Sequence, residues 1–208
     1  MPAVQPLLLA LALGLCTANR NQECDAKQIA RRLGQNPDAW RLIKRERAKY
    51  HLMFYSSGDL STMYKCLCTT TSSDRKGHKW QKVIKFHYSF NQTTILHGLH
   101  TLWTVKMDPY YVYDNAFNVT YYVHTSTETN FEAMFSASEV IFAQPRKCVV
   151  MKSDLLGYQV WVDTRYLKEY RKIPYMCTFM YEACAGARKN WVYDWDYCPW
   201  RTHELPEN

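Results

Sequence analysis

Most of the chain after residue 50 consists of short strand-like segments, and this pattern constrains the fold more than any other feature. In residues 79–90, large side chains at every second position alternate with mostly polar ones, which is typical of a half-buried strand. Strands are expected at residues 50–55, 62–71, 79–90, 94–107, 117–125, 131–143, 147–152 and 158–162. Eight consecutive strands with no helices between them predict a mostly β fold, either an antiparallel up-and-down barrel or a sandwich. A closed barrel of this size has room for one small ligand.

Two helices are expected, one on each side of the strand series. Asn36, Pro37 and Asp38 supply an N-cap, a first-turn proline and an acid, and this helix is expected to end near Lys49. A second helix is expected between Pro174 and Gly186, with a buried side formed by Met176, Phe179, Met180 and Ala183. Within the strand series, Gly98 is expected to mark a bend or a bulge.

The first residues resemble a secretory signal peptide. An apolar run at residues 7–15 is followed by small residues, which predicts cleavage after Ala18 and a single domain at residues 19–208. Seven of the eight cysteines follow residue 18, and in a secreted protein they are expected to form disulfides rather than metal sites. Sequons at Asn91 and Asn118 agree with export and predict glycosylation of an extracellular protein.

The formal net charge of +7 does not by itself indicate a nucleic-acid-binding protein, because the basic residues do not form one block. We find no hydrolase, metalloprotease, nucleotide-binding or dinucleotide-binding motif, so no enzymatic activity, cofactor or metal is expected. No segment after the signal peptide is long and apolar enough to suggest membrane insertion. We therefore expect a monomer that binds a small molecule, with a host protein as a further possible partner.

Several short segments, in order, resemble the tick salivary lipocalins of the histamine-binding family. They are Asp38-Ala39-Trp40, Tyr50-His51-Leu52-Met53, Asn115-Ala116-Phe117, Lys147-Cys148-Val149-Val150, Gly157-Tyr158-Gln159-Val160-Trp161 and the segment from Cys177 to Cys184. The resemblance implies an eight-stranded antiparallel lipocalin barrel with a short N-terminal helix and a C-terminal helix packed on its wall. It also implies disulfides joining Cys148 to Cys177, Cys24 to Cys184, and either Cys66 or Cys68 to Cys198.

The same resemblance implies a ligand-binding set inside the barrel. Tyr55 and Phe117 fall on aromatic positions, and Asp59 and Glu139 on or near acidic ones, whereas His100 and Gln159 stand where the family carries acids. The residues alone also allow a purely structural role for each of the polar ones. Glu139 is then a surface acid, Asp59 a turn residue and His100 an ordinary strand residue. Gln159 faces outward if the strand register differs by one residue.

Three functions follow from these residues. The family resemblance favours sequestration of a biogenic amine, either histamine or serotonin, at a feeding site. The reduced number of acids and the basic charge favour a fatty acid or a leukotriene, held by His100 with Lys or Arg side chains near the mouth. A third alternative is a host-protein-binding immunomodulator that uses the outer surface of the barrel.

Overall fold

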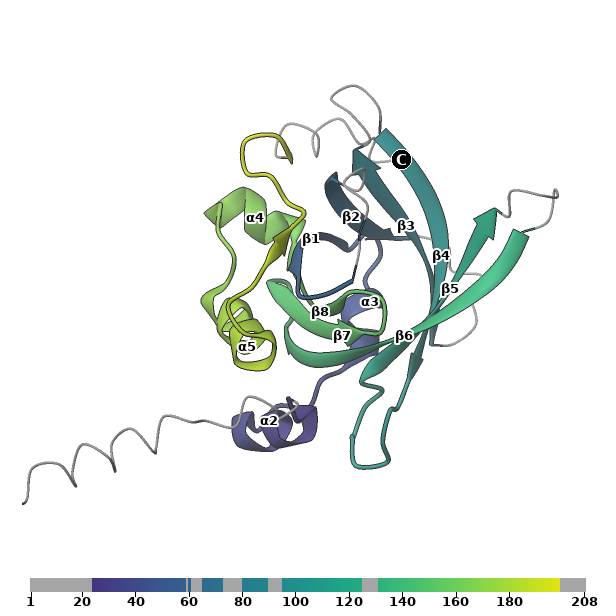
Figure 1. Cartoon of the computed structure of the whole chain (residues 1–208). Coiled ribbons are helices and arrows are strands. Elements are labelled where there is room, and N and C mark those ends of the chain that lie inside the picture. The colour runs from purple at the N-terminus through teal and green to yellow at the C-terminus, as the bar shows by residue number, and fades with distance from the viewer. Residues whose placement is uncertain are drawn as a thin grey trace, which may run out of the picture.

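The protein forms a closed barrel of eight antiparallel strands (Figure 1), in a computed structural model that describes residues 24–58, 60, 65–72, 80–89, 95–124 and 131–198. Each strand pairs with the next, and β1 closes the barrel because it pairs with both β8 and β2. The strands are β1 (Lys49–Tyr55), β2 (Lys65–Thr71), β3 (Gln81–Ser89), β4 (Ile95–Val105), β5 (Ala116–His124), β6 (Phe131–Gln144), β7 (Cys148–Ser153) and β8 (Gly157–Asp163). The mostly β barrel predicted from the sequence is confirmed.

The two ends of the barrel are built differently. At one end, here called the base, β1 begins and β8 ends, and the short helix α3 (Ala39–Ile43) contributes Ala39, Leu42 and Ile43 to the apolar interior. We call the opposite end, where β1 ends and β8 begins, the mouth. Because α3 belongs to the same apolar cluster as the inward side chains of the strands, the base is closed by packing.

The C-terminal tail completes the barrel wall between β1 and β2. Near the base β1 pairs directly with β2, but near the mouth it pairs with the two-residue strand β9 (Asn190–Trp191) instead. Beyond β9, the Val192 amide donates to the Met53 carbonyl (2.9 Å) and the Cys66 amide donates to the Val192 carbonyl (3.2 Å). The tail therefore bridges the two strands with backbone hydrogen bonds, and Val192 joins the apolar interior.

Three helices cover the outside of the barrel on one side (Figure 1). Helix α5 (Tyr175–Ala185) packs on β7 and β8, α4 (Thr164–Tyr170) on β8 and β1, and α2 (Ala26–Leu33) on β6. Their apolar side chains and the outward side chains of these strands form a second buried cluster that includes Met53, Ile141 and Val162. Several strands are consequently buried on both faces. In the described parts of the chain, no helix has the length and apolar character needed to cross a membrane.

The first predicted helix is shorter than expected. Asp38, not Asn36, is the N-cap, and its carboxylate accepts a hydrogen bond from the Arg41 amide. The helix ends at Ile43 instead of near Lys49, where β1 already begins. The flanking helices α2 and α4 were not predicted. Each begins at an aspartate N-cap, Asp25 and Asp163, and is too short for an apolar period to reveal it.

The C-terminal helix has the predicted ends, with Pro174 as N-cap residue and Gly186 as C-cap residue. Its buried side was predicted only in part. Met180 is buried, but Phe179 and Ala183 are exposed, and the buried positions are completed by Cys177 and Tyr181. The difference arises because the disulfide at Cys177 fixes which side of the helix faces the barrel.

The bend or bulge expected at Gly98 is absent. The register between β3 and β4 runs without interruption from Gln81 and Trp103 to Ser89 and Ile95. Gly98 instead makes room for its cross-strand neighbour Phe86, because a Cβ atom at Gly98 would lie 2.3 Å from the Phe86 ring. The glycine therefore marks a close approach of a ring to the backbone.

Three disulfides attach the outer elements to the barrel. Cys148 of β7 is joined to Cys177 of α5, and Cys24, just before α2, is joined to Cys184. Cys66 of β2 is joined to Cys198 of the tail, and Cys68 is the free, buried cysteine. These are the pairs that the family resemblance implied, and the structure selects Cys66 over Cys68 as the partner of Cys198.

Candidate ligand-binding site

The strand registers identify which side chains face the barrel interior. In the half nearer the base, most of these inward side chains are apolar and buried, and they pack against one another and against α3. They include Leu52, Ile84, Leu102, Phe117 and Trp161. This half of the interior is a hydrophobic core, and Phe117, one of the predicted ligand-binding residues, belongs to it.

Nearer the mouth, the inward side chains are only half-buried. Phe86 and Tyr88 of β3, His100 of β4, and Ser136 and Ser138 of β6 occupy inward positions, yet each remains partly accessible. Side chains that face into a barrel and remain accessible line the part of the interior that solvent or a ligand can enter. The candidate site is therefore the half of the barrel nearer the mouth.

A hydrogen-bonded group on β7 and β8 forms one wall of this half. The Gln159 side chain is 5% exposed; its amide nitrogen donates to Ser153 Oγ (2.6 Å) and its amide oxygen accepts from Trp161 Nε1 (3.0 Å). Tyr55 lies opposite Gln159 in the register, and its side chain belongs to the same interior apolar cluster as Trp161. The structure thus brings the predicted residues Tyr55 and Gln159 together, and the Gln159 side chain faces inward.

An aromatic ring lies next to the histidine on another wall. The centroids of the His100 and Phe86 rings lie 4.3 Å apart, and Phe86 also stacks with Tyr88, whose ring centroid is 6.0 Å away. Burial lowers the pKa of His100 below its usual value, so the neutral imidazole is favoured at neutral pH. Phe86 and Tyr88 were not predicted as site residues, although their alternation with polar neighbours was the signal for this strand.

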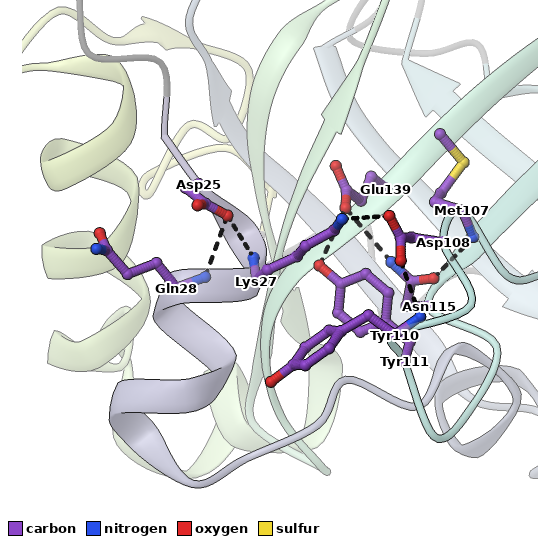
Figure 2. Close-up of polar contacts among 9 residues, drawn as sticks. All are labelled: Asp25, Lys27, Gln28, Met107, Asp108, Tyr110, Tyr111, Asn115 and Glu139. Atoms are coloured by element: carbon purple, nitrogen blue, oxygen red, sulfur yellow. Dashed lines mark hydrogen bonds and ion pairs between the residues drawn. The ribbon is translucent and has the colours of Figure 1, made fainter.

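Glu139 lies elsewhere, on the outward face of β6. Its carboxylate accepts hydrogen bonds from Tyr111 Oη (3.3 Å) and Asn115 Nδ2 (3.4 Å), next to the ion pair of Lys27 with Asp108 (Figure 2). Burial raises the pKa of Glu139, and the hydrogen bond from Tyr111 acts in the opposite direction. The structure does not bring Glu139 together with His100 and Gln159. Asp59, the other predicted acid, lies outside the described residues.

The charged and polar side chains of the described inner wall differ between its two ends. At the base, the inward carboxylate of Asp163 accepts a hydrogen bond from Arg45 Nη2 (2.8 Å) and also caps α4. Nearer the mouth, the described inner wall presents aromatic rings, hydroxyl groups, the Gln159 amide and the His100 imidazole. This wall suits a ligand with an apolar body and a group that accepts hydrogen bonds.

The solved structures that align with this chain have low sequence identity to it. The serotonin complex of the protein AM182 aligns with a TM-score of 0.55 and 13% identity, covering 85% of this chain and 97% of the other. Lobster apocrustacyanin A1 aligns with a TM-score of 0.48 and 12% identity, covering 86% and 90%. Japanin from Rhipicephalus appendiculatus, bound to cholesterol, aligns with a TM-score of 0.45 and 11% identity, covering 73% and 95%.

A family assignment comes from the sequence itself. No curated protein matches the sequence. The profile described as "Tick histamine binding protein" matches residues 28–199, which span the barrel, helices α3, α4 and α5, and most of α2. The family and the barrel are those of small-ligand-binding proteins of the lipocalin kind. The chain therefore belongs to the tick histamine-binding protein family.

Proposed function

We propose that this protein sequesters one small amphipathic anion, of the fatty acid or leukotriene class, in the half of the barrel nearer the mouth. The observation that carries the proposal is the composition of the described inner wall. It combines aromatic rings with His100 and Gln159, and its described carboxylate, Asp163, is at the base and already paired with Arg45.

The argument rests on the cost of burying a charge. A cationic amine placed in a sheltered interior needs a carboxylate nearby, because an unpaired buried charge is strongly unfavourable. A carboxylate ligand instead requires hydrogen-bond donors or a cation. His100 becomes such a cation when it takes up a proton, and a bound carboxylate would favour that protonated form. The rings of Phe86 and Tyr88 then provide apolar surface for the rest of the ligand.

A biogenic amine is the second candidate. It is supported by membership of the histamine-binding family and by the likeness in fold to a protein solved with serotonin. Asp59 is the residue that we expect to serve an amine, together with Tyr55. Glu139 does not support this candidate, because its carboxylate lies on the outward face of β6.

The setting of this activity is part of the proposal. We propose that residues 1–18 are removed as a signal peptide and that residues 19–208 act as a single secreted, non-enzymatic and monomeric domain. The three disulfides and the absence of membrane-spanning helices among the described residues agree with an extracellular protein.

Calorimetric titration of the secreted chain with arachidonic acid, leukotriene B4, histamine and serotonin tests the proposal. We expect heat from the lipid carboxylates and a roughly tenfold loss of their affinity in His100→Gln, which corresponds to about 1.4 kcal/mol. Heat from the amines alone would favour the second candidate. No heat from any ligand, with capture of a host protein, would support a role for the outer surface.

A further inference from the structure

An exposed apolar surface lies on the side of the barrel away from the helices. It is formed by the outward side chains of β4, β5 and β6, and we call it the Trp103–Phe135 face. Leu99 is 56% exposed, Trp103 40% and Phe135 75%. In Figure 1, β4, β5 and β6 extend to the right, whereas α4 and α5 lie to the left on β1, β7 and β8. Apolar surface of this kind usually has a binding partner or a covering group.

The centre of this face is a glycosylation sequon. Asn118 of β5 lies directly opposite Trp103 on one side and Ala137 on the other. Two residues further on, Thr120 lies opposite Phe135. Asn118 and Thr120 are the acceptor and the hydroxyl residue of the sequon Asn118-Val119-Thr120, and the Asn118 side chain is exposed. Side chains directly opposite on neighbouring strands have Cβ atoms about 5 Å apart, so Trp103 lies within reach of a group attached to Asn118.

We propose that an N-linked glycan on Asn118 covers the Trp103–Phe135 face, with its first N-acetylglucosamine residue lying on the Trp103 ring. In the attachment step, the Asn118 amide nitrogen forms a bond to C1 of an oligosaccharide supplied by a lipid-linked diphosphate donor. The bond between C1 and the phosphate oxygen breaks, the lipid diphosphate leaves, and the amide nitrogen loses one proton.

The chemistry of the two partners is complementary. One face of a pyranose ring carries mainly C–H groups, and an indole ring presents a polarisable, electron-rich face to them. The hydroxyl groups of the sugar remain on the outer side, so the covered surface becomes polar and soluble. A protein partner is disfavoured on this face because the glycan would project from its centre.

The first test keeps the protein sequence of the face intact. The full chain carrying Asn91→Gln, which leaves Asn118 as the single sequon, is secreted from eukaryotic cells that attach high-mannose glycans. Peptide mass spectrometry then measures occupancy at Asn118. Endoglycosidase H trims one sample to a single N-acetylglucosamine, and peptide N-glycosidase F removes the glycan from another. An unoccupied Asn118 would overturn the proposal.

Hydroxyl-radical labelling of the two samples measures how well Trp103 is covered. Trp191 is the control, because it is 55% exposed and lies on β9, which pairs with β1, outside the face. We expect the oxidation of Trp103, relative to that of Trp191, to be slower while the sugar is present than after its removal. Equal oxidation of Trp103 in both samples would contradict the proposal.

Thermal unfolding provides the second test. Complete removal of the glycan should lower Tm by about 2–4 °C relative to the single-sugar form. The enzyme converts Asn118 to aspartate, so the Asn118→Asp variant serves as the control for the added charge. In a Trp103→Ala background, glycan removal should leave Tm unchanged. An equal loss of Tm in both backgrounds would show that the sugar does not lie on Trp103.

Discussion

Single inward side chains decide what the barrel can bind, and Gln159 is the most informative of them. Its amide is nearly inaccessible and is held from both ends, by Ser153 and by the Trp161 indole. The family resemblance implies an acid at this position, where this chain has a neutral amide of nearly the same shape. A carboxylate at this position would keep the hydrogen bond from Trp161, and the Ser153 hydroxyl, which accepts a hydrogen bond from Gln159, would instead donate to the carboxylate.

The variant Gln159→Glu should therefore invert the ligand preference. The added negative charge should weaken binding of a lipid carboxylate and strengthen binding of histamine or serotonin, each by about 1–3 kcal/mol. Calorimetric titration of both ligand classes measures the change. Glu139→Gln, which alters a carboxylate on the outward face, serves as the control and should leave both affinities unchanged. If Gln159→Glu also leaves them unchanged, the ligand does not reach this wall.

His51 is a second informative residue, because its burial should make the stability of the protein depend on pH. It is 1% exposed, neither ring nitrogen has a hydrogen-bond partner among the residues that the structure describes, and its ring centroid lies 5.4 Å from that of Tyr193. Burial lowers its pKa from 6.5 to about 3, with a smaller contribution from Lys49 and Lys168. The unfolded chain therefore takes up a proton near pH 6.5, whereas the folded protein does not until about pH 3.

The free energy of unfolding should consequently fall as the pH drops below 6.5. The contribution of His51 to this fall is about 1.4 kcal/mol for each pH unit. Chemical denaturation between pH 7 and pH 5 measures the slope. In His51→Phe the slope should be shallower over this range, and His100→Gln controls for the other histidine with a lowered pKa. Identical slopes in the original chain and in His51→Phe would contradict the prediction.

At the scale of elements, the C-terminal tail is part of the barrel and not an appendage. The tail supplies backbone hydrogen bonds to β1 and β2 and an interior side chain, Val192, at the place where these two strands separate. The Cys66–Cys198 disulfide fixes the end of this segment to β2. The Tyr197 hydroxyl, 2.8 Å from Ser89 Oγ, links it to β3 as well.

Removal of this disulfide should open the wall at the tail. For the double variant Cys66→Ser with Cys198→Ser, we expect a loss of about 2–4 kcal/mol in the free energy of unfolding. Hydrogen exchange should accelerate at the amides of Val192 and Tyr193, which both donate to Met53. The matched control, Cys24→Ser with Cys184→Ser, should leave these two amides protected. Protection that survives in the first variant would show that the strand pairing holds the tail by itself.

At the scale of the whole molecule, three disulfides tie β2, β7 and the segment before α2 to the C-terminal region. Cys68 remains as a buried thiol in a part of the wall covered by this region. Burial raises its pKa to about 12, so the reactive thiolate is scarce at neutral pH. Cys68 also lies directly opposite His51 in the register between β1 and β2.

Thiol labelling should therefore report on global unfolding. We expect no reaction of the native secreted protein with N-ethylmaleimide, and one label per chain, at Cys68, after denaturation without a reductant. Peptide mass spectrometry identifies the labelled residue. A label at Cys66 or Cys198 would indicate a different disulfide pattern, and rapid labelling of the native protein would show that this part of the wall opens locally.

Glu139 shows why sequence patterns did not place every site residue. Glu139 and Ile141 are two positions apart on β6, and both lie on the outward face of this strand, which α2 covers. A buried apolar neighbour therefore does not identify the inward face of a strand that is buried on both sides. The register also shifts between Val140 and Phe142 and between Leu52 and Phe54, so alternation is interrupted within both strands. One extra residue moves every later side chain to the opposite face.

The sequence by itself determined the eight strands, the ends of the C-terminal helix and the class of fold, because alternation, proline and glycine act through local backbone geometry. Family resemblance added the disulfide pairs. Only the tertiary structure decided that Gln159 faces inward, that Glu139 faces outward and that the tail forms part of the wall. Each of these depends on pairing between residues far apart in the chain, and local sequence carries little information about such pairing.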